Sequence, residues 1–268
     1  MSATPLLPSH PLLDRLWARY LVDVPYARTL ASLHDGPVRN DHIALRSLAP
    51  VAEDPRGGIA MFARVFAALG WRHAGTYHFP DVHLRAVHLS QPGLPRIFIS
   101  QLDASALPSG PRAILEALPR DDAWSHAPPL TSPVTDADAL AACFCAPAVS
   151  PTSAALDEVA AVSQYGAWLL AFGRKVNHFT ASVDDVEVWQ RRLREAGIPM
   201  KSDIEGERGG PLRQTATLAA LADVALADGS TRALPYAYVE IAQRRADFDG
   251  FLSPQARQLF EMTSTTRA

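Results

Sequence analysis

The sequence predicts an α+β fold in which two modules, each a strand followed by a helix and three strands, form one curved sheet around a metal site. Two observations support this prediction. The order of predicted elements over residues 38–102 returns over residues 173–245, and repetition within a chain is a direct guide to its architecture. Both modules also open on a strand with a histidine near its start. We therefore expect one metalloenzyme domain over residues 1–268, with a helical insertion at residues 103–165 and a C-terminal helical tail at residues 246–268.

The composition is that of an ordinary globular protein. Hydrophobic residues make up 48% of the chain and charged residues 20%. The net charge of -3 provides no basic footprint for nucleic acid. No apolar run approaches the roughly 18 residues of a membrane span, and charged residues interrupt the apolar N-terminal stretch, so we expect neither a signal peptide nor a membrane partner. The cytoplasm is the expected location, and the sequence leaves the oligomeric state open.

The two cysteines do not predict a redox or zinc site. Cys143 and Cys145 are separated by one residue, a spacing that fits neither the zinc nor the thioredoxin pattern. We interpret both as small buried side chains. A chain without a disulfide framework gives no hint of export.

The first half of the chain contains the N-terminal helices and the first module. Residues 11–33 place apolar residues at helical spacing, which predicts one or two amphipathic helices packed on the main body. In the module, Gly70 ends the predicted helix. The predicted elements are a strand at 40–48, a helix at 59–69 and strands at 72–78, 82–90 and 96–102.

The second half contains the insertion and the second module. The insertion is rich in alanine, proline and serine, and we expect it to be packed because Trp124, Leu140 and Phe144 need burial. Its predicted helices lie at 111–118, 136–145 and 154–164. The second module repeats the order of the first. Its predicted elements are a strand at 176–183, a helix at 185–196 and strands at 212–218, 222–227 and 233–242.

The strand at residues 40–48 carries two groups that a buried strand rarely contains. Because side chains alternate between the faces of a strand, His42, Ala44 and Arg46 point to the same side. Imidazole is the commonest metal ligand, and guanidinium is a natural bidentate partner of a carboxylate. The pattern predicts a metal beside an anionic ligand; the alternative is a structural His–Arg pair. The opening Asn40-Asp-His-Ile returns as Val176-Asn-His-Phe, which gives His178 the equivalent position.

A carboxylate lies within the last predicted strand, which is otherwise apolar. Alternation puts Tyr238 and Glu240 on one face, and a buried carboxylate is costly unless it is paired or binds a metal. An ion pair with Arg244 or Arg213 is the alternative. Two histidines and one carboxylate hold one face of a metal and leave positions open, as in non-heme Fe(II) oxygenases. The candidate metal ligands are therefore His42, His178 and Glu240.

Several short motifs are distributed over roughly residues 38–263. They are Asn40-Asp-His-Ile-Ala-Leu-Arg46, Leu94-Pro-Arg-Ile-Phe-Ile-Ser100, Gly173-Arg-Lys-Val-Asn-His-Phe-Thr180, Leu212-Arg-Gln-Thr215, Tyr238-Val-Glu-Ile-Ala-Gln-Arg244, and the tail motifs Gly250-Phe251 and Leu259-Phe260-Glu-Met-Thr263. Together they resemble the 2-oxoadipate dioxygenase/decarboxylase family of the vicinal-oxygen-chelate superfamily. Each motif is short, and the combination is specific.

The resemblance implies a vicinal-oxygen-chelate fold with Fe(II) held by His42, His178 and Glu240. It also implies that Arg46 grips a carboxylate of a 2-oxo acid, as a catalytic and substrate-binding residue. In the family's reaction, dioxygen and 2-oxoadipate give 2-hydroxyglutarate and carbon dioxide by oxidative decarboxylation and hydroxylation. The implied partners are thus a small 2-oxo acid and O2.

Two further residues are assigned to substrate binding. Gln214 resembles the substrate-facing glutamine of the related 4-hydroxyphenylpyruvate dioxygenases, and an ordinary edge-strand glutamine is the alternative. Tyr238 shares the face of Glu240 and is expected to contact the substrate. The helical insertion and the tail from Phe251 to Phe260 are candidates for closing the site.

Three other histidines, at positions 78, 83 and 88, form a second local cluster. His83 and His88 are predicted on opposite faces of one strand, so they cannot bind the same ion. We expect structural or surface roles for all three.

Two other classes of function stay open. The same scaffold supports metal-dependent lyases, isomerases and ring-cleaving dioxygenases, because a fold does not fix function. The second class is a non-catalytic binding paralogue. A pure scaffold, however, has no reason to bury His42, Glu240 and Arg46 together.

Overall fold

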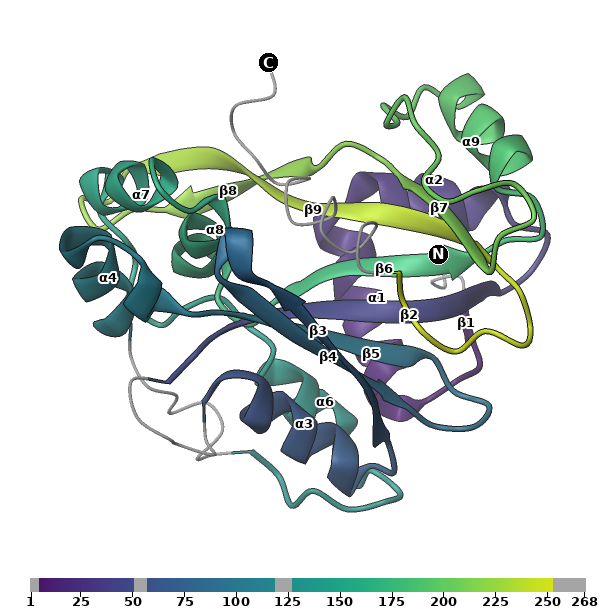
Figure 1. The fold of residues 1–268 in the computed structure, drawn as a ribbon, viewed down its shortest axis with the longest axis horizontal. Helices are drawn as coiled ribbons and strands as arrows, with labels where there is room; N and C mark the ends of the chain where they lie inside the picture. Colours follow the sequence, from purple (N-terminus) through teal and green to yellow (C-terminus); the bar gives the residue numbers. More distant parts are fainter. Residues whose placement is uncertain (1–4, 51–56, 119–126, 253–268) are drawn as a thin grey trace.

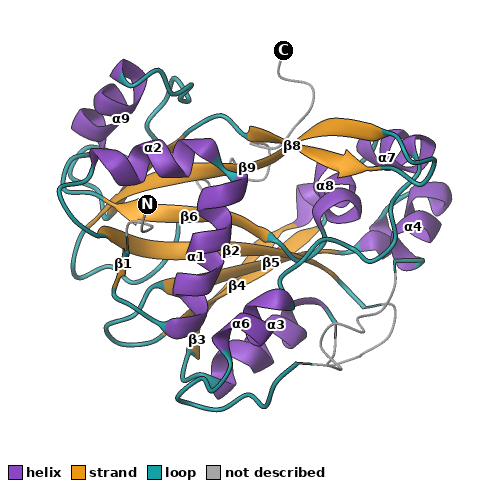
Figure 2. Ribbon diagram, turned by 180° about the vertical axis from the view of Figure 1, so that it is seen from behind, coloured by secondary structure: helices purple, strands orange, loops and turns teal. Residues whose placement is uncertain are grey.

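The computed structural model describes residues 5–50, 57–118 and 127–252. Trp124 and most of the predicted C-terminal tail lie outside the described residues. The chain forms a curved sheet with helices behind it and around its edges (Figures 1 and 2). The strands are β1 (Leu6–Leu7), β2 (Val38–Leu48), β3 (Arg72–Phe79), β4 (Leu84–Ser90), β5 (Arg96–Leu102), β6 (Val176–Ser182), β7 (Leu212–Ala216), β8 (Ala220–Ala225) and β9 (Thr231–Arg244). The helices are α1 (Pro11–Asp23), α2 (Pro25–Leu33), α3 (Gly58–Ala68), α4 (Ser109–Glu116), α6 (Ala137–Ala142), α7 (Ser153–Ala160), α8 (Gln164–Phe172) and α9 (Val186–Glu195), with short 3-10 helices at Pro80–Val82 and Ala104–Ala106.

The first module is confirmed, with every predicted element present. β2 is followed by α3 and then by β3, β4 and β5. α3 forms because its apolar residues recur at helical spacing and are buried against the sheet, and Gly70, with φ of 108°, follows its last turn. β5 pairs in parallel with β2, and β4 and β3 extend the sheet outward as antiparallel strands.

The second module has the predicted order of elements but a different arrangement of its strands. β6 pairs antiparallel with β2, which joins the two modules at the centre of the sheet, and β9 pairs in parallel with β6. β9 is 14 residues long, whereas β5 has 7. β7 pairs with the C-terminal half of β9 and β8 with its N-terminal half. β7 and β8 therefore run in the same direction along one long partner instead of forming the antiparallel series of the first module.

The N-terminal helices are confirmed as two helices, and α1 crosses the back of the central strands (Figure 2).

The helix predicted at 154–164 is wrong at its end. α7 stops at Ala160, and the hydroxyl of Ser163 accepts a hydrogen bond from the Gly166 N–H at the start of a separate helix, α8. Seven of the nine residues of α8 are buried, so it has no polar face on which helical periodicity depends. For this reason the pattern of apolar residues does not predict α8.

His83 does not lie in a strand. The strand predicted at 82–90 begins at Leu84, and His83 follows a 3-10 turn with φ of 56°. The prediction that His83 and His88 share a strand is therefore wrong. His88 alone lies in β4, where it is buried.

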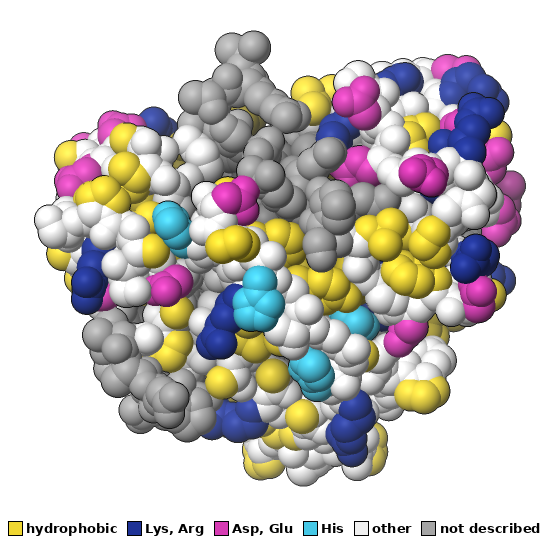
Figure 3. Space-filling view, viewed as in Figure 1, with side chains coloured by type: hydrophobic (Ala, Val, Ile, Leu, Met, Phe, Trp, Pro, Cys, Tyr) yellow, Lys and Arg dark blue, Asp and Glu magenta, His cyan; other side chains and the backbone are white. Residues whose placement is uncertain are grey.

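Charged residues of both signs are interspersed on the face shown in Figure 3, in the part of it that the structure describes. The described helices include none that is both long and apolar enough to cross a lipid bilayer.

Two glycines that follow helices provide a matched test of backbone strain. Gly173 has φ of 56° after α8, and a Cβ there would lie 2.8 Å from Cδ of Pro147 and 3.1 Å from the carbonyl oxygen of Cys145. Gly197 has φ of 80° after α9, with open space around it. We expect Gly197→Ala to lower the free energy of unfolding by about 1–2 kcal/mol, the cost of a left-handed non-glycine residue. Crowding by Pro147 and Cys145 should raise the loss in free energy of unfolding for Gly173→Ala to about 2–5 kcal/mol. Urea denaturation measures both, and equal losses would contradict this account of Gly173.

Candidate metal centre

The three candidate ligands meet at one point, although 136 and 62 residues separate them along the chain. Neighbouring strands bring them together, because His42 on β2 pairs with Thr180 on β6, and Thr180 pairs with Glu240 on β9. Nε2 of His42 lies 3.4 Å from Nε2 of His178 and 3.6 Å from Oε1 of Glu240. One ligand atom from each residue lies within 4.8 Å of the other two, and all three residues are buried.

Glu240 is not paired with either arginine that the sequence offered as an alternative. Arg244 pairs with Asp41, with Nε 2.8 Å from Oδ2. Arg213 pairs with Glu187, with Nη2 2.9 Å from Oε1. The buried ion pair considered for Glu240 is therefore wrong.

The carboxylate of Glu240 has few hydrogen-bond donors around it among the described residues. Its Oε1 accepts one hydrogen bond from the hydroxyl of Thr180 at 3.3 Å, and its Oε2 has no hydrogen-bond partner among the described residues. Burial raises the pKa of Glu240 well above its usual value, and the nearby carboxylates of Glu205 and Asp41 raise this pKa further. Lys201 acts in the opposite direction, as a weaker influence. A divalent cation at this position would supply the charge that the protein does not.

Both imidazoles present the same ring nitrogen to this position. Nδ1 of His42 lies 2.7 Å from Oδ1 of Asp41, and Nδ1 of His178 lies 3.1 Å from Oδ1 of Asn177. In each ring, Nε2 faces the candidate centre, and Nε2 of His42 also lies 3.0 Å from the hydroxyl of Thr180. Burial lowers the pKa of both histidines, strongly for His178, although Asp41 partly opposes this for His42. Neutral imidazole is the form that binds a metal.

Asp41 is held as a charged side chain. Burial alone would raise the pKa of Asp41, but hydrogen bonds from His42 and Arg244 outweigh it and hold this pKa well below its usual range. The guanidinium of Arg244 donates to both carboxylate oxygens, at 2.8 Å and 2.9 Å. The donor set of two neutral imidazoles and one uncompensated carboxylate therefore fits a divalent metal.

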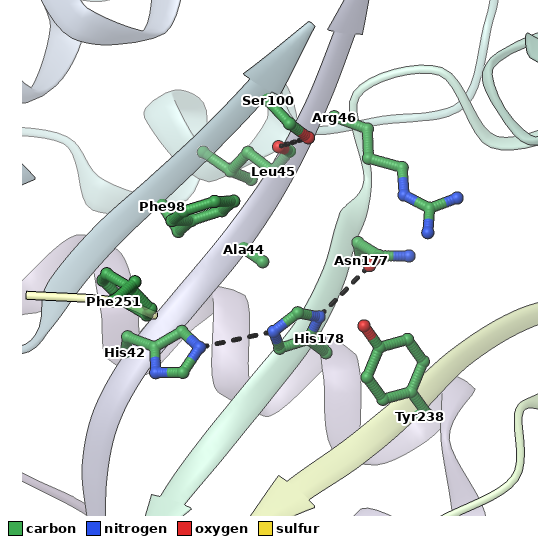
Figure 4. A pocket seen from close by; sticks show the side chains of 10 residues that line it. All are labelled: His42, Ala44, Leu45, Arg46, Phe98, Ser100, Asn177, His178, Tyr238 and Phe251. Carbon is green, nitrogen blue, oxygen red and sulfur yellow. Dashed lines mark hydrogen bonds between the residues drawn. The ribbon is translucent and has the colours of Figure 1, made fainter. Parts of the chain in front are cut away.

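A pocket connects the two candidate histidine ligands with Arg46. Figure 4 shows His42 and His178 turned toward each other at one end and Arg46 at the other, with the small side chain of Ala44 between them. The lining residues are His42, Ala44, Leu45, Arg46, Phe98, Ser100, Asn177, His178, Tyr238 and Phe251. Arg46 is the one residue among them that carries a permanent positive charge.

Helix α8, which the sequence analysis did not predict, supplies the aromatic surroundings of Arg46. The guanidinium carbon of Arg46 lies 4.9 Å from the ring centre of Tyr165 and 5.0 Å from that of Trp168. The hydroxyl of Tyr165 also bonds Ser100 at 2.8 Å and accepts the backbone N–H of Ser47. Cation–π contacts of this kind hold a guanidinium in place without neutralising it.

The two residues assigned to substrate binding beside Arg46 lie in different places. Tyr238 lines the pocket, and its ring stacks on His178 with 4.7 Å between ring centres. Gln214 is buried in the edge strand β7, where its Nε2 lies 3.4 Å from Oε2 of Glu205. It pairs with Ala242, two pairs beyond the pair that contains Glu240, and is not among the residues that line the pocket.

Phe251, the first residue of the tail that the sequence offers as a candidate for closing the site, lines the pocket. Its ring meets that of His42 edge to face at 4.8 Å, and its backbone N–H donates to the hydroxyl of Tyr77. His88 bonds the same hydroxyl through Nδ1 and lies against Phe251, so it is part of the packing around the pocket. Desolvation lowers the pKa of His88 to about 4.

Known proteins have sequences similar to that of this chain. A family model described as 2-oxoadipate dioxygenase/decarboxylase matches residues 23–267. The chloroplastic 2-oxoadipate dioxygenase/decarboxylase of Arabidopsis thaliana is 26% identical over 80% of this chain and 60% of its own length. A chloroplastic/amyloplastic relative of the same name from Oryza sativa subsp. japonica is 26% identical over 91% of this chain and 76% of its own. The chain thus spans about 60% of the Arabidopsis protein. The plastid names of these relatives leave the cytoplasmic location of this chain a prediction.

Similar solved structures establish the fold. The hydroxyglutarate synthase from Oryza sativa, solved in complex with 2-oxoadipate, has a TM-score of 0.79, with 24% identity and coverage of 99% of this chain and 96% of that one. A glyoxalase-superfamily protein from Ralstonia eutropha JMP134 has a TM-score of 0.72 at 24% identity, over 88% of this chain and 82% of that one. The predicted α+β fold of vicinal-oxygen-chelate type is confirmed. With the family model matching nearly the whole chain, this protein belongs to the 2-oxoadipate dioxygenase/decarboxylase family.

Proposed function

We propose that the chain is a non-heme Fe(II) dioxygenase that converts a 2-oxo dicarboxylic acid, with 2-oxoadipate as the expected substrate, to 2-hydroxyglutarate and carbon dioxide. The observation that carries this proposal is the convergence of two neutral imidazoles and a buried carboxylate beside a pocket that is lined by both histidines and by Arg46. The reaction is that of the family to which the chain belongs.

His42, His178 and Glu240 are the residues that would hold the metal. Three protein ligands on one side leave the other positions open. Bound Fe(II) supplies those positions to a 2-oxo acid and to dioxygen, and with them the redox chemistry of the reaction. The contribution of the protein is to hold its ligands, orient the substrate and keep water out.

A divalent metal at one end of the pocket and Arg46 at the other would offer two positions for carboxylates, which supports a 2-oxo dicarboxylic acid as the substrate.

The side chains of the pocket suggest how the substrate is oriented. The guanidinium of Arg46 can accept a carboxylate in a bidentate, charge-assisted contact, and the rings of Tyr165 and Trp168 restrict its movement. The hydroxyl of Tyr238 keeps its proton because burial raises its pKa well above the usual value, so it can donate to a substrate oxygen. The rings of Phe98 and Phe251 provide apolar walls that limit access of water.

Removal of one candidate ligand tests the metal centre. We expect His178→Ala to lose most bound iron and essentially all turnover, because only two of the three protein ligands remain. Iron content is measured by elemental analysis and the fold by circular dichroism. His73→Ala, the same change at an exposed histidine of β3, serves as the control and should retain iron. Full iron occupancy in His178→Ala would show that His178 is structural.

Replacement of Arg46 tests the anchor for the substrate. Arg46→Met keeps the length of the side chain and removes its charge, so iron should be retained while about 2–5 kcal/mol of substrate interaction is lost. The expected fall in kcat/KM for 2-oxoadipate is about 30-fold or more, measured by oxygen consumption.

The matched control is Arg192→Met. Arg192 also lies over an aromatic ring, 4.5 Å from the ring centre of Trp189, and is not one of the residues that line the pocket. The variant Arg192→Met should leave kcat/KM for 2-oxoadipate unchanged. An unchanged rate in Arg46→Met together with a lower melting temperature would assign Arg46 a structural role.

A further inference from the structure

Each candidate histidine ligand is preceded by a polar residue whose side chain points in an unexpected direction. Successive residues of a regular strand point to opposite faces, so Asp41 should face away from His42, and Asn177 away from His178. In the structure both side chains instead bond the Nδ1 atom of the histidine that follows. A local irregularity of the strands is needed to bring this about.

The pairing of β2 with β6 contains two such irregularities. Asn40 pairs with Ala181 and His42 with Thr180, so Asp41 is an extra residue on β2. Further along, Ala44 pairs with His178 and Leu45 with Val176, so Asn177 is an extra residue on β6. A β-bulge of this kind redirects a side chain. The two bulges lie on opposite strands, and each comes directly before a candidate ligand.

We propose that Asp41 and Asn177 are positioning residues for the metal, each turned by a β-bulge so that its side-chain oxygen fixes the imidazole of the next residue with Nε2 toward the centre. This proposal deepens the function proposed above and rests on its metal centre. In this role each residue contacts the imidazole of a histidine and acts on the metal only through that imidazole.

The chemistry of imidazole explains why such residues are needed. A neutral imidazole carries one N–H, which can be on either nitrogen, and only the other nitrogen has a lone pair for a metal. An oxygen acceptor at Nδ1 keeps the proton there and sets the orientation of the ring. The carboxylate of Asp41, paired with Arg244, has no proton to donate, so it can only accept. Asn177 provides an amide oxygen for the same purpose.

The two positioning residues differ in how they are anchored. Arg244 donates to both oxygens of Asp41 and also to the carbonyl oxygen of Gly250, so a change at Asp41 would leave a buried cation and disturb the chain beside Phe251. Asn177 bonds only His178 through its side chain among the described residues, and its Nδ2 has no partner there. Asn177 is therefore the residue at which positioning can be tested with the fewest side effects.

The test measures Co(II) binding to the metal-free full-length protein by competition with a chelator. We expect Asn177→Leu, which keeps the size of the side chain and removes the acceptor, to bind Co(II) about 10–100-fold more weakly. Asn177→Ala, which removes the same oxygen without adding bulk, should show the same loss. Asn177→Asp restores an oxygen acceptor and should recover the affinity. The visible absorption bands of bound Co(II), which report ligand geometry, should change in the first two variants and not in the third.

Asn40→Leu is the matched control, because Asn40 is also a buried asparagine near His42 and has no hydrogen bond to either imidazole among the described residues. It should keep the affinity of the unchanged protein. If the unchanged protein binds no Co(II), the metal centre itself is refuted. If it binds Co(II) and Asn177→Leu and Asn177→Ala bind equally well, only the positioning role is refuted. An equal loss in Asn40→Leu would also refute it, since any buried amide would then have the same effect.

Discussion

Burial of the Glu240 carboxylate is the constraint on which the arrangement of the site depends. A carboxylate that is removed from water needs a cation or several donors, and Glu240 has one hydroxyl donor at 3.3 Å. Lys201, which lowers the pKa of Glu240, is already paired with Glu205, and Arg244 is paired with Asp41. A divalent metal would resolve this conflict, and any metal that binds only the folded chain would also stabilise it. The burial that disfavours the charged carboxylate in the metal-free protein would favour a cation beside it.

The rest of the fold holds this centre from several directions. The antiparallel contact of β2 with β6 joins the two modules and places one histidine from each on neighbouring strands, two residue pairs apart. Behind the sheet, the hydroxyl of Tyr20 on α1 donates to the carbonyl oxygen of Tyr238. Trp168 on α8 makes two contacts. Its Nε1 donates to the carbonyl oxygen of Tyr236 at 2.6 Å, and its ring lies beside the guanidinium of Arg46. α8 therefore links the strand that carries the carboxylate ligand to the arginine proposed to bind the substrate.

Local patterns in the sequence were sufficient for the modules and for the faces of their strands. Alternation placed His42 and Arg46 on one side of β2, and the repeated opening motif indicated His178. The same rule failed where a strand is irregular, because it turns Asp41 and Asn177 away from the histidines that they contact. α8 escaped prediction because burial all around it removes the helical pattern. The arrangement of β7 and β8 along β9 depends on which strand each one pairs with, and local sequence does not encode that choice.

The most direct test of the account is a crystal structure of the iron-loaded protein with 2-oxoadipate, grown without oxygen, with anomalous scattering measured at the iron edge. The account predicts one anomalous peak bonded to Nε2 of His42, Nε2 of His178 and the carboxylate of Glu240, with a substrate carboxylate against the guanidinium of Arg46. A peak at another group of residues, or a Glu240 carboxylate turned away from the metal, would contradict the account.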